Sequence, residues 1–273
     1  MTIDAPAKVN LVLRILGRRS DGFHEIETLM VPLALADEIS VTVSEGSGVQ
    51  LECDDPGVPV DASNLAARAA VVFAERTGRV FRTGIVLKKR IPTGAGLGGG
   101  SSDAASVLLA LNRLLEAGLD AGALEAMAAE LGSDVAFFIQ RKAAWCRGRG
   151  ELIEPVDDVP GLRLLMVKPP FPVPTVWAYK AWSACGGRGI AAAAETLELV
   201  NDFEPVVFEK YVLLAVMKDW LGRQEGVEAV MMSGSGSTLF AVLKGAADGI
   251  EERIRGEFGP QVWMCRTRTA GNG

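Results

Sequence analysis

The stretch IPTGAGLGGGSSDAAS occupies residues 91–106 and is the most informative part of the sequence. Five of the seven residues from Gly94 to Gly100 are glycine, and an apolar pattern typical of a helix follows them. The loop satisfies the dinucleotide-binding pattern GxGxxG through Gly94, Gly96 and Gly99. It also comes close to the phosphate-binding pattern GxxxxGK[ST], with Gly100 where the lysine is required. Three interpretations are therefore open: a dinucleotide site, a nucleotide triphosphate site, or a flexible linker.

The chain that follows the loop separates these interpretations. A dinucleotide fold needs a second parallel strand after the helix, whereas the helix expected at about 101–117 is followed by another helix at about 121–131. Without its lysine, the P-loop interpretation is weaker still. A linker would not run directly into a helix start that carries Ser101, Ser102 and Asp103, because serines there cap free amides. Glycines bend around an anion and a helix N-terminus attracts it, so we favour a phosphate-binding loop.

Length, charge and composition limit the class of protein. The 273 residues suffice for one large domain or two modest ones, and 49% hydrophobic with 23% charged residues is ordinary globular composition. No apolar run approaches the ~18 residues of a membrane span, and the N-terminus lacks the features of a signal peptide. We therefore expect a cytoplasmic protein with no membrane partner. The net charge of −6 disfavours nucleic-acid binding through a broad basic field.

Cysteine and histidine usage excludes several kinds of metal and redox site. The four cysteines are widely scattered and form no CxxC pair, so a zinc ribbon or a redox dithiol is not expected. His24 is the only histidine, which excludes HExxH and every multi-histidine metal site. It also leaves a serine–histidine–aspartate triad with a single candidate base.

Hydrophobic periodicity predicts an α+β chain, because pairs of helices separate the strands instead of single helices alternating with them. The sequence patterns predict strands at 8–16, 26–35, 38–45, 49–55, 83–92, 163–171 and 262–268, strand–turn–strand units at 143–156 and 227–243, and helices at 64–78, 101–117, 121–131, 191–200, 205–222 and 245–258. The Gly- and Ala-rich patch 183–195 is expected to be a mobile connection or a loosely packed helix start. The expected boundary near 155–165 gives an N-terminal domain at 1–157 and a C-terminal domain at 158–273.

Three segments resemble, in the same order, the three motifs of the kinases grouped with galactokinase, homoserine kinase, mevalonate kinase and phosphomevalonate kinase. APAKVNLVLRI (5–15) resembles the first motif, PTGAGLGGGSSDAA (92–105) the second, and MSGSGSTLFAV (232–242) the third. The similarity spans nearly the whole chain. It implies a two-domain α+β kinase fold, in which an N-terminal ATP-binding domain and a C-terminal substrate domain flank a cleft.

Further segments are similar to the 4-diphosphocytidyl-2-C-methyl-D-erythritol kinase family: DGFHEIET (21–28), LGSDVAFFI (131–139), GRGELI (148–153) and PPFPVPTVWAYKAW (169–182). Ala136 stands where that family usually has proline, which affects only local backbone rigidity. The resemblance implies phosphorylation of the 2-hydroxyl of this small-molecule substrate by ATP and Mg²⁺, in non-mevalonate isoprenoid precursor synthesis. Two alternatives remain: a kinase acting on mevalonate or homoserine, and a non-catalytic binder of nucleotide or sugar.

The resemblance implies that Lys8 and Asp134 are the catalytic pair, with Asp134 near the acceptor hydroxyl and Lys8 near the transferred phosphoryl group. Taken alone, Asp134 is better explained as a helix N-cap and Lys8 as a solvated strand end. The loop amides would hold the triphosphate, and Ser101 or Ser102 would offer a hydroxyl to Mg²⁺. The implied ATP contacts are Pro92, Gly94, Ala95, Gly96, Leu97, Gly98, Gly99, Gly100, Ser101, Ser102, Asn64 and Lys89.

On the acceptor side, the resemblance places His24 beside the cytosine, since its ring nitrogens suit the edge of a base. It aligns Tyr179 with an aromatic residue that stacks on the cytosine, and it places three more residues nearby: Asn10, Phe23 and Thr175. Taken alone, His24 is a partly exposed turn residue, Tyr179 equally a core residue of a helix, and Lys89 a solvated charge. A monomer or a weak homodimer is expected.

Overall fold

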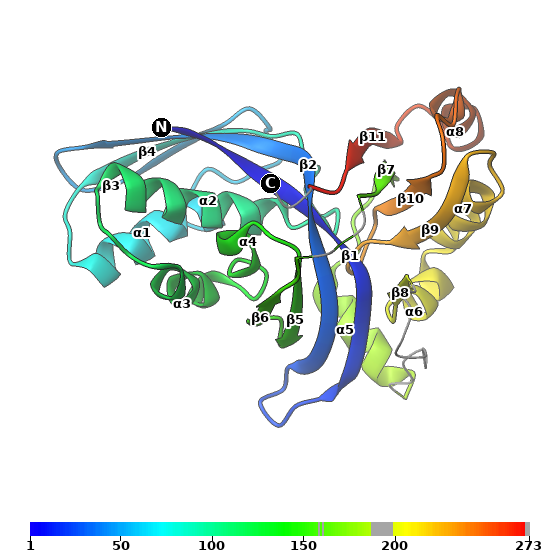
Figure 1. Ribbon diagram of the computed structural model, residues 1–273, viewed down its shortest axis with the longest axis horizontal. Helices are drawn as coiled ribbons and strands as arrows, with labels where there is room; N and C mark the ends of the chain where they lie inside the picture. Colours follow the sequence, from blue (N-terminus) through cyan, green and yellow to red (C-terminus); the bar gives the residue numbers. More distant parts are fainter. Residues whose placement is uncertain (158, 160, 187–198, 271–273) are drawn as a thin grey trace.

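A long antiparallel pair of strands forms the centre of the molecule (Figure 1). The computed structural model describes residues 1–157, 159, 161–186 and 199–270. β1 (Thr2–Arg18) pairs along its length with β2 (His24–Ser44). The predicted strands 26–35 and 38–45 are therefore one strand of 21 residues. Pro32 lies inside it beside a register shift, and a β-bulge of this kind tolerates a residue that lacks an N–H.

The N-terminal sheet has the strand order β3-β4-β2-β1-β8, and β5 and β6 extend it from β2. Its further strands are β3 (Gly48–Cys53), β4 (Arg82–Lys88), β5 (Ala144–Gly148), β6 (Leu152–Pro155) and β8 (Val200–Asn201). Four helices cover one face (Figure 1): α1 (Leu65–Thr77), α2 (Gly99–Leu114), α3 (Ala121–Leu131) and α4 (Phe137–Gln140). The core between them is built from small residues and phenylalanines, among them Phe73 and Phe138, so α2 packs closely on β1 and β2.

The C-terminal sheet is antiparallel with the order β11-β7-β10-β9. Its strands are β7 (Arg163–Lys168), β9 (Val227–Met232), β10 (Leu239–Leu243) and β11 (Trp263–Arg268). The remaining helices are α5 (Thr175–Ala184), α6 (Glu204–Lys210), α7 (Val212–Gly222) and α8 (Ile250–Phe258). One face of this sheet packs on these helices, and the other packs against β1 and the glycine loop. The α+β class predicted from the sequence is confirmed.

Two predicted helices of the C-terminal half differ from the structure. The helix expected at 205–222 is divided at Tyr211, whose backbone (φ −101°, ψ 64°) leaves the helical region while its ring stacks on Phe171. The helix expected at 191–200 lies mostly outside the described residues, and its last residue, Val200, is in a strand. Most of the patch 183–195 also lies outside them. None of the described helices is long and apolar enough to cross a membrane.

A short strand from the C-terminal half joins the two sheets. β8 pairs in parallel with β1, and Asn201 within it donates hydrogen bonds to the carbonyls of Met232 (2.7 Å) and Gly234 (2.8 Å). The side-chain oxygen of Asn201 accepts from the N–H of Phe203 (2.9 Å), so all its hydrogen-bonding groups hold neighbouring backbone. This anchors the 232–242 motif beside β1. Because β8 belongs to the N-terminal sheet, the division into domains at 157/158 stays a prediction.

Candidate active site

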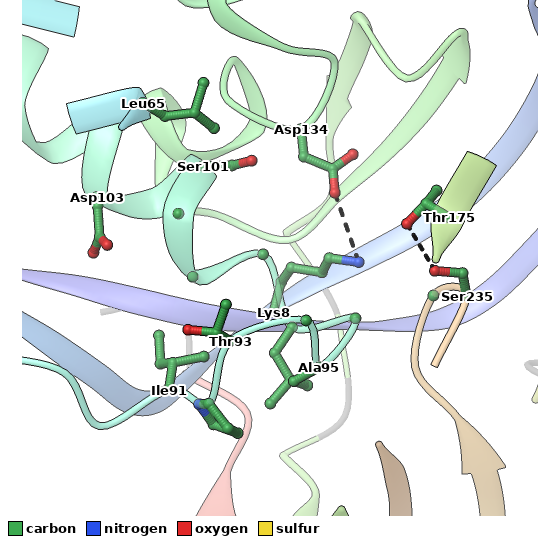
Figure 2. A pocket seen from close by; sticks show the side chains of 18 of the residues that line it. Lys8, Leu65, Ile91, Thr93, Ala95, Ser101, Asp103, Asp134, Thr175 and Ser235 are labelled. Atoms are coloured by element: carbon green, nitrogen blue, oxygen red, sulfur yellow. Dashed lines mark hydrogen bonds and ion pairs between the residues drawn. The ribbon is translucent and has the colours of Figure 1, made fainter. Parts of the chain in front are cut away.

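A cleft of about 470 Å³ gathers residues from all three motifs (Figure 2). Most of the predicted site residues line it: Lys8, Asn10, Asn64, Lys89, Pro92, Gly94, Ala95, Gly96, Leu97, Gly98, Gly99, Gly100, Ser101, Asp134, Thr175 and Tyr179. Three predicted site residues do not line it, namely Phe23, His24 and Ser102. The cleft thus joins segments that are more than 200 residues apart in the sequence, since Ser235 of the third motif also lines it.

The glycine loop has a fixed shape. Gly94, Gly96 and Gly98 all have positive φ (63°, 74° and 72°), a conformation that disfavours other residues. A Cβ at Gly96 would lie 2.2 Å from the carbonyl oxygen of Ser233, so the third motif packs directly against this position. The Lys8 N–H donates to the carbonyl of Leu97 (2.9 Å), and the Ser233 hydroxyl donates to the carbonyl of Gly96 (3.0 Å). The linker interpretation is therefore wrong.

The loop delivers the N-terminus of α2 to the cleft. The first helical hydrogen bond runs from the N–H of Ser102 to the carbonyl of Gly98 (2.9 Å). The N–H groups of Gly99, Gly100 and Ser101 therefore have no partner within the helix, and all three residues line the cleft. Three free amides at the positive end of a 16-residue helix form an anion-binding position.

Ser101 and Ser102 are placed differently. Successive residues of a helix point about 100° apart, since there are about 3.6 residues per turn. Ser101 lines the cleft, whereas Ser102 is fully buried and its hydroxyl oxygen has no hydrogen-bond partner among the described residues. With its N–H used inside the helix as well, Ser102 has no group that reaches the cleft. The predicted contact of Ser102 with ATP stays a prediction, and Ser101 is the better placed of the two serines.

The predicted catalytic residues face each other across the cleft (Figure 2). Nζ of Lys8 lies 3.8 Å from Oδ2 of Asp134 and donates a hydrogen bond to Oδ1 of Asn10 (2.7 Å). Lys8 is 4% exposed, whereas the side chain of Asp134 is 42% exposed. Burial lowers the pKa of Lys8, and the negative charge of Asp134 opposes this effect. The site thus combines a buried ammonium with a carboxylate that solvent and ligands can reach.

Both local explanations of this pair are wrong. Lys8 is not a solvated strand end, because β1 begins at Thr2 and Lys8 lies inside it beside a β-bulge. Asp134 does not cap α4, whose N-cap position is Ala136 and which has no side-chain cap. Asp134 instead lies in the turn after Gly132, where α3 ends, and its side chain is directed at Lys8.

A hydrogen-bond chain orients the Lys8 side chain. Nδ2 of Asn10 donates to Oγ1 of Thr28 (2.8 Å), which donates in turn to the carbonyl of Val12 (2.6 Å). Because the amide nitrogen of Asn10 is occupied by Thr28, its amide oxygen faces the ammonium. Thr28 was not predicted as a site residue, although it ends the DGFHEIET segment. Its role follows only from the pairing of β1 with β2.

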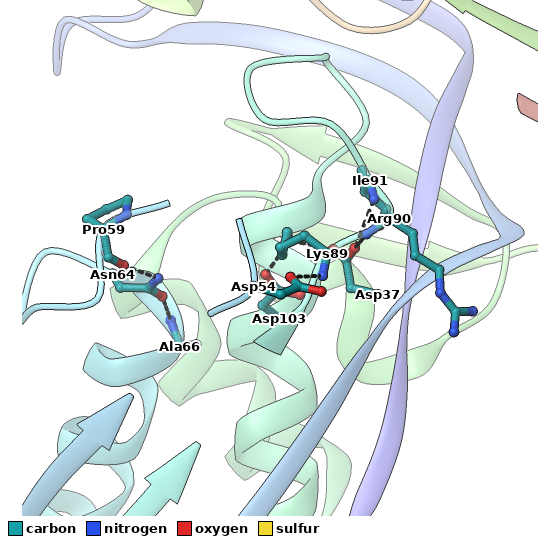
Figure 3. Close-up of polar contacts among 9 residues, drawn as sticks. All are labelled: Asp37, Asp54, Pro59, Asn64, Ala66, Lys89, Arg90, Ile91 and Asp103. Atoms are coloured by element: carbon teal, nitrogen blue, oxygen red, sulfur yellow. Dashed lines mark hydrogen bonds and ion pairs between the residues drawn. The ribbon is translucent and has the colours of Figure 1, made fainter. Parts of the chain in front are cut away.

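Lys89 is the centre of a buried ionic cluster (Figure 3). Its Nζ binds a carboxylate oxygen of Asp37 and Oδ2 of Asp103, the latter at 2.6 Å. The three side chains are at most 6% exposed, so the solvated-charge interpretation of Lys89 is wrong. Oδ1 of Asp37 accepts from the N–H groups of Arg90 (2.5 Å) and Ile91 (2.8 Å). The cluster therefore holds the segment that leads into the glycine loop.

The charges in this cluster depend on one another. Burial lowers the pKa of Lys89, but the carboxylates of Asp103 and Asp37 outweigh it, so the pKa is raised overall. Burial also raises the pKa of Asp103, and Asp37 adds to this while Lys89 opposes it. The Lys89 ammonium is thus committed to two carboxylates. Two of its three N–H donors are thereby used, and its position shapes the cleft.

The far end of the cleft is a narrow, mostly apolar region formed by Val58, Pro59 and Leu65 with Asn64. Asn64 is the N-cap of α1: its Oδ1 accepts from the N–H of Ala66 (2.9 Å), and its Nδ2 donates to the carbonyl of Pro59 (2.7 Å) (Figure 3). Both polar groups of Asn64 therefore fix the shape of the 58–65 loop.

The opposite end of the cleft is aromatic and comes from α5. The ring of Tyr179 stacks on His24 (centroids 4.7 Å apart) and meets Phe203 edge-on, so Tyr179 both packs in the core and lines the cleft. Nε2 of His24 lies 2.7 Å from Oγ of Ser183. Burial, helped by Arg18, lowers the pKa of His24, so its ring is neutral at pH 7.

Two further contacts complete this end. Oγ1 of Thr175 lies 2.9 Å from Oγ of Ser235, which ties α5 to the third motif (Figure 2). Phe23, at 51% exposure, lies in the β1–β2 turn with the Arg149 guanidinium 4.8 Å from its ring centroid. Phe23 and His24 thus lie next to the cleft, on the far side of Tyr179, and do not form its wall.

Family comparisons agree with this geometry. The model of the GHMP kinases N terminal domain matches residues 64–142, and that of the GHMP kinases C terminal domain matches residues 185–261. The chain is 43% identical to 4-diphosphocytidyl-2-C-methyl-D-erythritol kinase of Methylacidiphilum infernorum, over 95% of this chain and 93% of that protein. The chain belongs to this kinase family. The enzyme of the same name from Syntrophotalea carbinolica is 40% identical, with 93% and 92% of the two chains covered.

Solved structures extend the comparison. A crystal structure of 4-(cytidine 5'-diphospho)-2C-methyl-D-erythritol kinase matches with a TM-score of 0.80 and 35% identity, covering 99% of this chain and 100% of that one. Homoserine kinase from Cytophaga hutchinsonii matches with a TM-score of 0.67 at 17% identity, over 99% and 94% of the two chains, and shows a shared fold. The resemblance inferred from the motifs is confirmed.

Replacing Gly96 tests the fixed shape of the loop. Gly96→Ala places a Cβ 2.2 Å from the Ser233 carbonyl at a positive φ, so overpacking and backbone strain add. We expect a loss of about 2–6 kcal/mol in the free energy of unfolding. The control is Gly100→Ala, where the nearest atom is 4.0 Å away and the fold should be unaffected. Chemical denaturation measures both; equal stabilities would contradict the anchoring of the loop.

Replacing Lys89 tests the buried ionic cluster. Lys89→Met leaves two buried carboxylates without their cation and should cost about 3–5 kcal/mol in unfolding free energy. The control Lys88→Met removes a 60%-exposed lysine paired with Glu38 and should cost at most about 1 kcal/mol. Removing the Lys89 charge raises the already raised pKa of Asp103 further above its value in the unfolded chain. Ionised Asp103 is then disfavoured in the folded protein, so the loss of unfolding free energy in Lys89→Met should grow as pH rises. A pH-independent loss would contradict this account.

Proposed function

We propose that this kinase transfers the γ-phosphoryl group of ATP to the 2-hydroxyl of 4-diphosphocytidyl-2-C-methyl-D-erythritol, giving the 2-phosphate and ADP. The observation that supports it most directly is the Lys8–Asp134 pair, 3.8 Å apart, in the same cleft as the free amides of α2. Phosphoryl transfer needs mainly positioning and charge neutralisation, and these groups offer both.

The nucleotide binds along the glycine loop. Its triphosphate accepts hydrogen bonds from the N–H groups of Gly99, Gly100 and Ser101, and the α2 dipole favours its negative charge. The base then lies toward the apolar end of the cleft, near Pro59 and Asn64. This orientation directs the γ-phosphate at Lys8, on the other side of the loop.

The acceptor hydroxyl lies between Asp134 and the γ-phosphate. As the oxygen attacks phosphorus, its proton passes to the Asp134 carboxylate, the new O–P bond forms, and the bond to the bridging oxygen of ADP breaks. The Lys8 ammonium stabilises negative charge on the transferred group and lowers the repulsion between phosphate and Asp134. Because Asn10 holds this ammonium in place, little reorganisation is needed.

Ser101 is the residue we assign to Mg²⁺. Magnesium prefers few protein ligands together with phosphate oxygens and water, and the Ser101 hydroxyl lies at the cleft end of α2. Ser102, the alternative from the sequence, does not fit because it is fully buried. No cluster of three or more histidine, cysteine or acidic side chains suited to a metal occurs in the described part of the chain. When bound, Mg²⁺ neutralises charge on the β- and γ-phosphates.

The cytidine end of the acceptor lies at the aromatic end of the cleft. Tyr179 offers a ring face, the neutral His24 offers its Nδ1 beyond the contact of Nε2 with Ser183, and Phe23 is exposed. Asn10 and Thr175 line the path from these aromatic residues to Lys8. We also propose that the protein acts in the cytoplasm, as a monomer or weak homodimer, without nucleic-acid or membrane partners.

A substrate panel tests the choice of acceptor. With ATP and Mg²⁺, the cytidine substrate should be phosphorylated and mevalonate or homoserine should not. Turnover of mevalonate alone would replace the proposed acceptor. Nucleotide binding without transfer to any candidate would support a non-catalytic role.

Substitution of Asp134 tests its role in the reaction. Asp134→Asn keeps the shape and hydrogen-bonding capacity of the side chain but removes the proton acceptor, so kcat should fall by a factor of about 10²–10⁴. Nucleotide affinity should change little, because the amides of α2 remain in place. The control is Asp219→Asn, an exposed carboxylate on α7 that is remote from the cleft lining. Near-normal turnover in Asp134→Asn would remove the catalytic assignment.

The pH dependence of kcat tests the charge on Lys8. Burial lowers the pKa of Lys8 from its ordinary value of 10.5, so kcat should fall as pH rises through this lowered value. Lys8→Arg stays protonated throughout and should lack this alkaline limb, at a lower kcat because the planar guanidinium fits poorly. In Asp134→Asn the limb should move to lower pH, since the charge that opposes the shift is gone. An unchanged limb in Lys8→Arg would assign it to another group.

A further inference from the structure

A second cavity, of about 530 Å³, lies where β7, β10 and β11 end near β2. It shares no lining residue with the active-site cleft. Four arginines line it, and none of its described lining residues is acidic: Arg90, Arg163, Arg266 and Arg268. In a chain whose net charge is −6, this local excess of positive charge is unusual.

Two of these arginines face each other. Arg163 and Arg268 are direct partners in the antiparallel pairing of β7 with β11, so their side chains leave the same face of the sheet. Like charges directly opposite destabilise a sheet. Within the described residues, neither guanidinium has a carboxylate at ion-pair distance. An anion between them would relieve this repulsion.

Arg266 differs, because its guanidinium is already held. It pairs with both carboxylate oxygens of Glu251 (2.5 and 3.0 Å) and donates to the carbonyls of Ala246 (2.5 Å) and Ala247 (3.0 Å). Arg266 therefore forms a fixed wall of the cavity between β11 and the start of α8. Among the described residues, the guanidinium groups of the other three arginines have no carboxylate at ion-pair distance, and two of them, Arg163 and Arg268, oppose each other directly.

The remaining lining is largely apolar. Leu164 is fully buried, Leu243 is 7% exposed, and Leu35 and Ala36 come from β2. A ligand that fits this cavity has an anionic group for the arginines and an apolar body for the wall. Arginine binds carboxylate and phosphate alike through two parallel N–H groups, which disfavours a halide. Two opposed guanidinium groups favour a phosphate over a single carboxylate, because the phosphate carries more charge and more acceptor oxygens.

We propose that this cavity is a second binding site, for a small organic phosphate or diphosphate with an apolar body. Arg163 and Arg268 bind the phosphate, and Leu35 and Leu243 contact the body. Arg90 completes the rim; its backbone N–H is held by Asp37, and its neighbours Lys89 and Ile91 line the active-site cleft. The proposal does not rest on the function assigned to that cleft.

Calorimetric titration with inorganic diphosphate tests the phosphate part. ADP is first titrated and then kept saturating, so that the nucleotide part of the active-site cleft is filled and its binding is established separately. The double variant Arg163→Ser with Arg268→Ser should bind diphosphate at least about 10-fold more weakly than the unchanged protein. The control, Arg82→Ser with Arg113→Ser, has the same change in net charge on exposed arginines elsewhere and should bind within about 2-fold.

Equal losses of diphosphate affinity in both double variants would mean that diphosphate binding depends only on net charge, and the site would be rejected. Absence of diphosphate binding to the ADP-saturated protein would reject it as well. A thermal melt without ligand checks whether the variant is folded. The Arg163/Arg268 variant should be at least as stable as the unchanged protein, because the opposed charges are removed. The stabilisation by diphosphate should disappear in this variant.

Two monoesters test the apolar part of the site. Butyl phosphate should bind more tightly than methyl phosphate to the ADP-saturated protein, because its chain covers apolar surface near Leu35 and Leu243. The difference should vanish in the Arg163/Arg268 variant. Equal affinities of the two esters in the unchanged protein would contradict the proposed ligand class.

Discussion

The active site depends on keeping a positive charge at Lys8, where 4% of the residue reaches solvent. A buried ammonium is stable only with close partners, and Lys8 has the Asn10 amide oxygen at 2.7 Å and Asp134 at 3.8 Å. The surrounding backbone must also approach closely. A Cβ at Gly98 would lie 3.2 Å from the Lys8 side chain, and one at Gly234 would lie 3.4 Å from its Nζ. The three sequence motifs therefore meet at one ammonium group.

The two proposed catalytic groups have different supports, and this suits the roles that we propose for them. Lys8 lies on β1, packed between the glycine loop and the neighbouring strand, so its charge is fixed before any ligand arrives. Asp134 lies in a turn between two helices and is 42% exposed, so an acceptor hydroxyl can reach it. In the proposed reaction, a rigid cation preorganises the site for the phosphate, and an accessible carboxylate admits varied acceptors. The proposal therefore assigns the choice of acceptor to the aromatic end of the cleft.

The sequence predicted the α+β class and the meeting of Lys8, Asp134 and the glycine loop in one cleft, because each depends on a short motif or on periodicity. It missed features that depend on distant partners. Lys89 looks solvated within KKR, since its carboxylates lie 52 and 14 residues away. The sequence does not distinguish Ser101 from Ser102, because both are serines at the start of a predicted helix. Only the direction in which each side chain leaves α2 separates them. The break at Tyr211 depends on its stacking with Phe171, and the single strand β2 on its pairing with β1.

Net charge excluded a broad basic field, but it says nothing about where the cations lie. The cations of the active-site cleft are lysines, whose pKa responds to burial and whose point charge can serve a reacting phosphate. The second cavity is lined by arginines, which stay charged and match a bound phosphate with paired N–H groups. Lys8 thus offers one compact charge beside the proposed reacting groups, whereas the paired N–H groups of the arginines suit the static recognition of a phosphate. The residue types therefore agree with the proposal that the second cavity binds a phosphate without reacting with it.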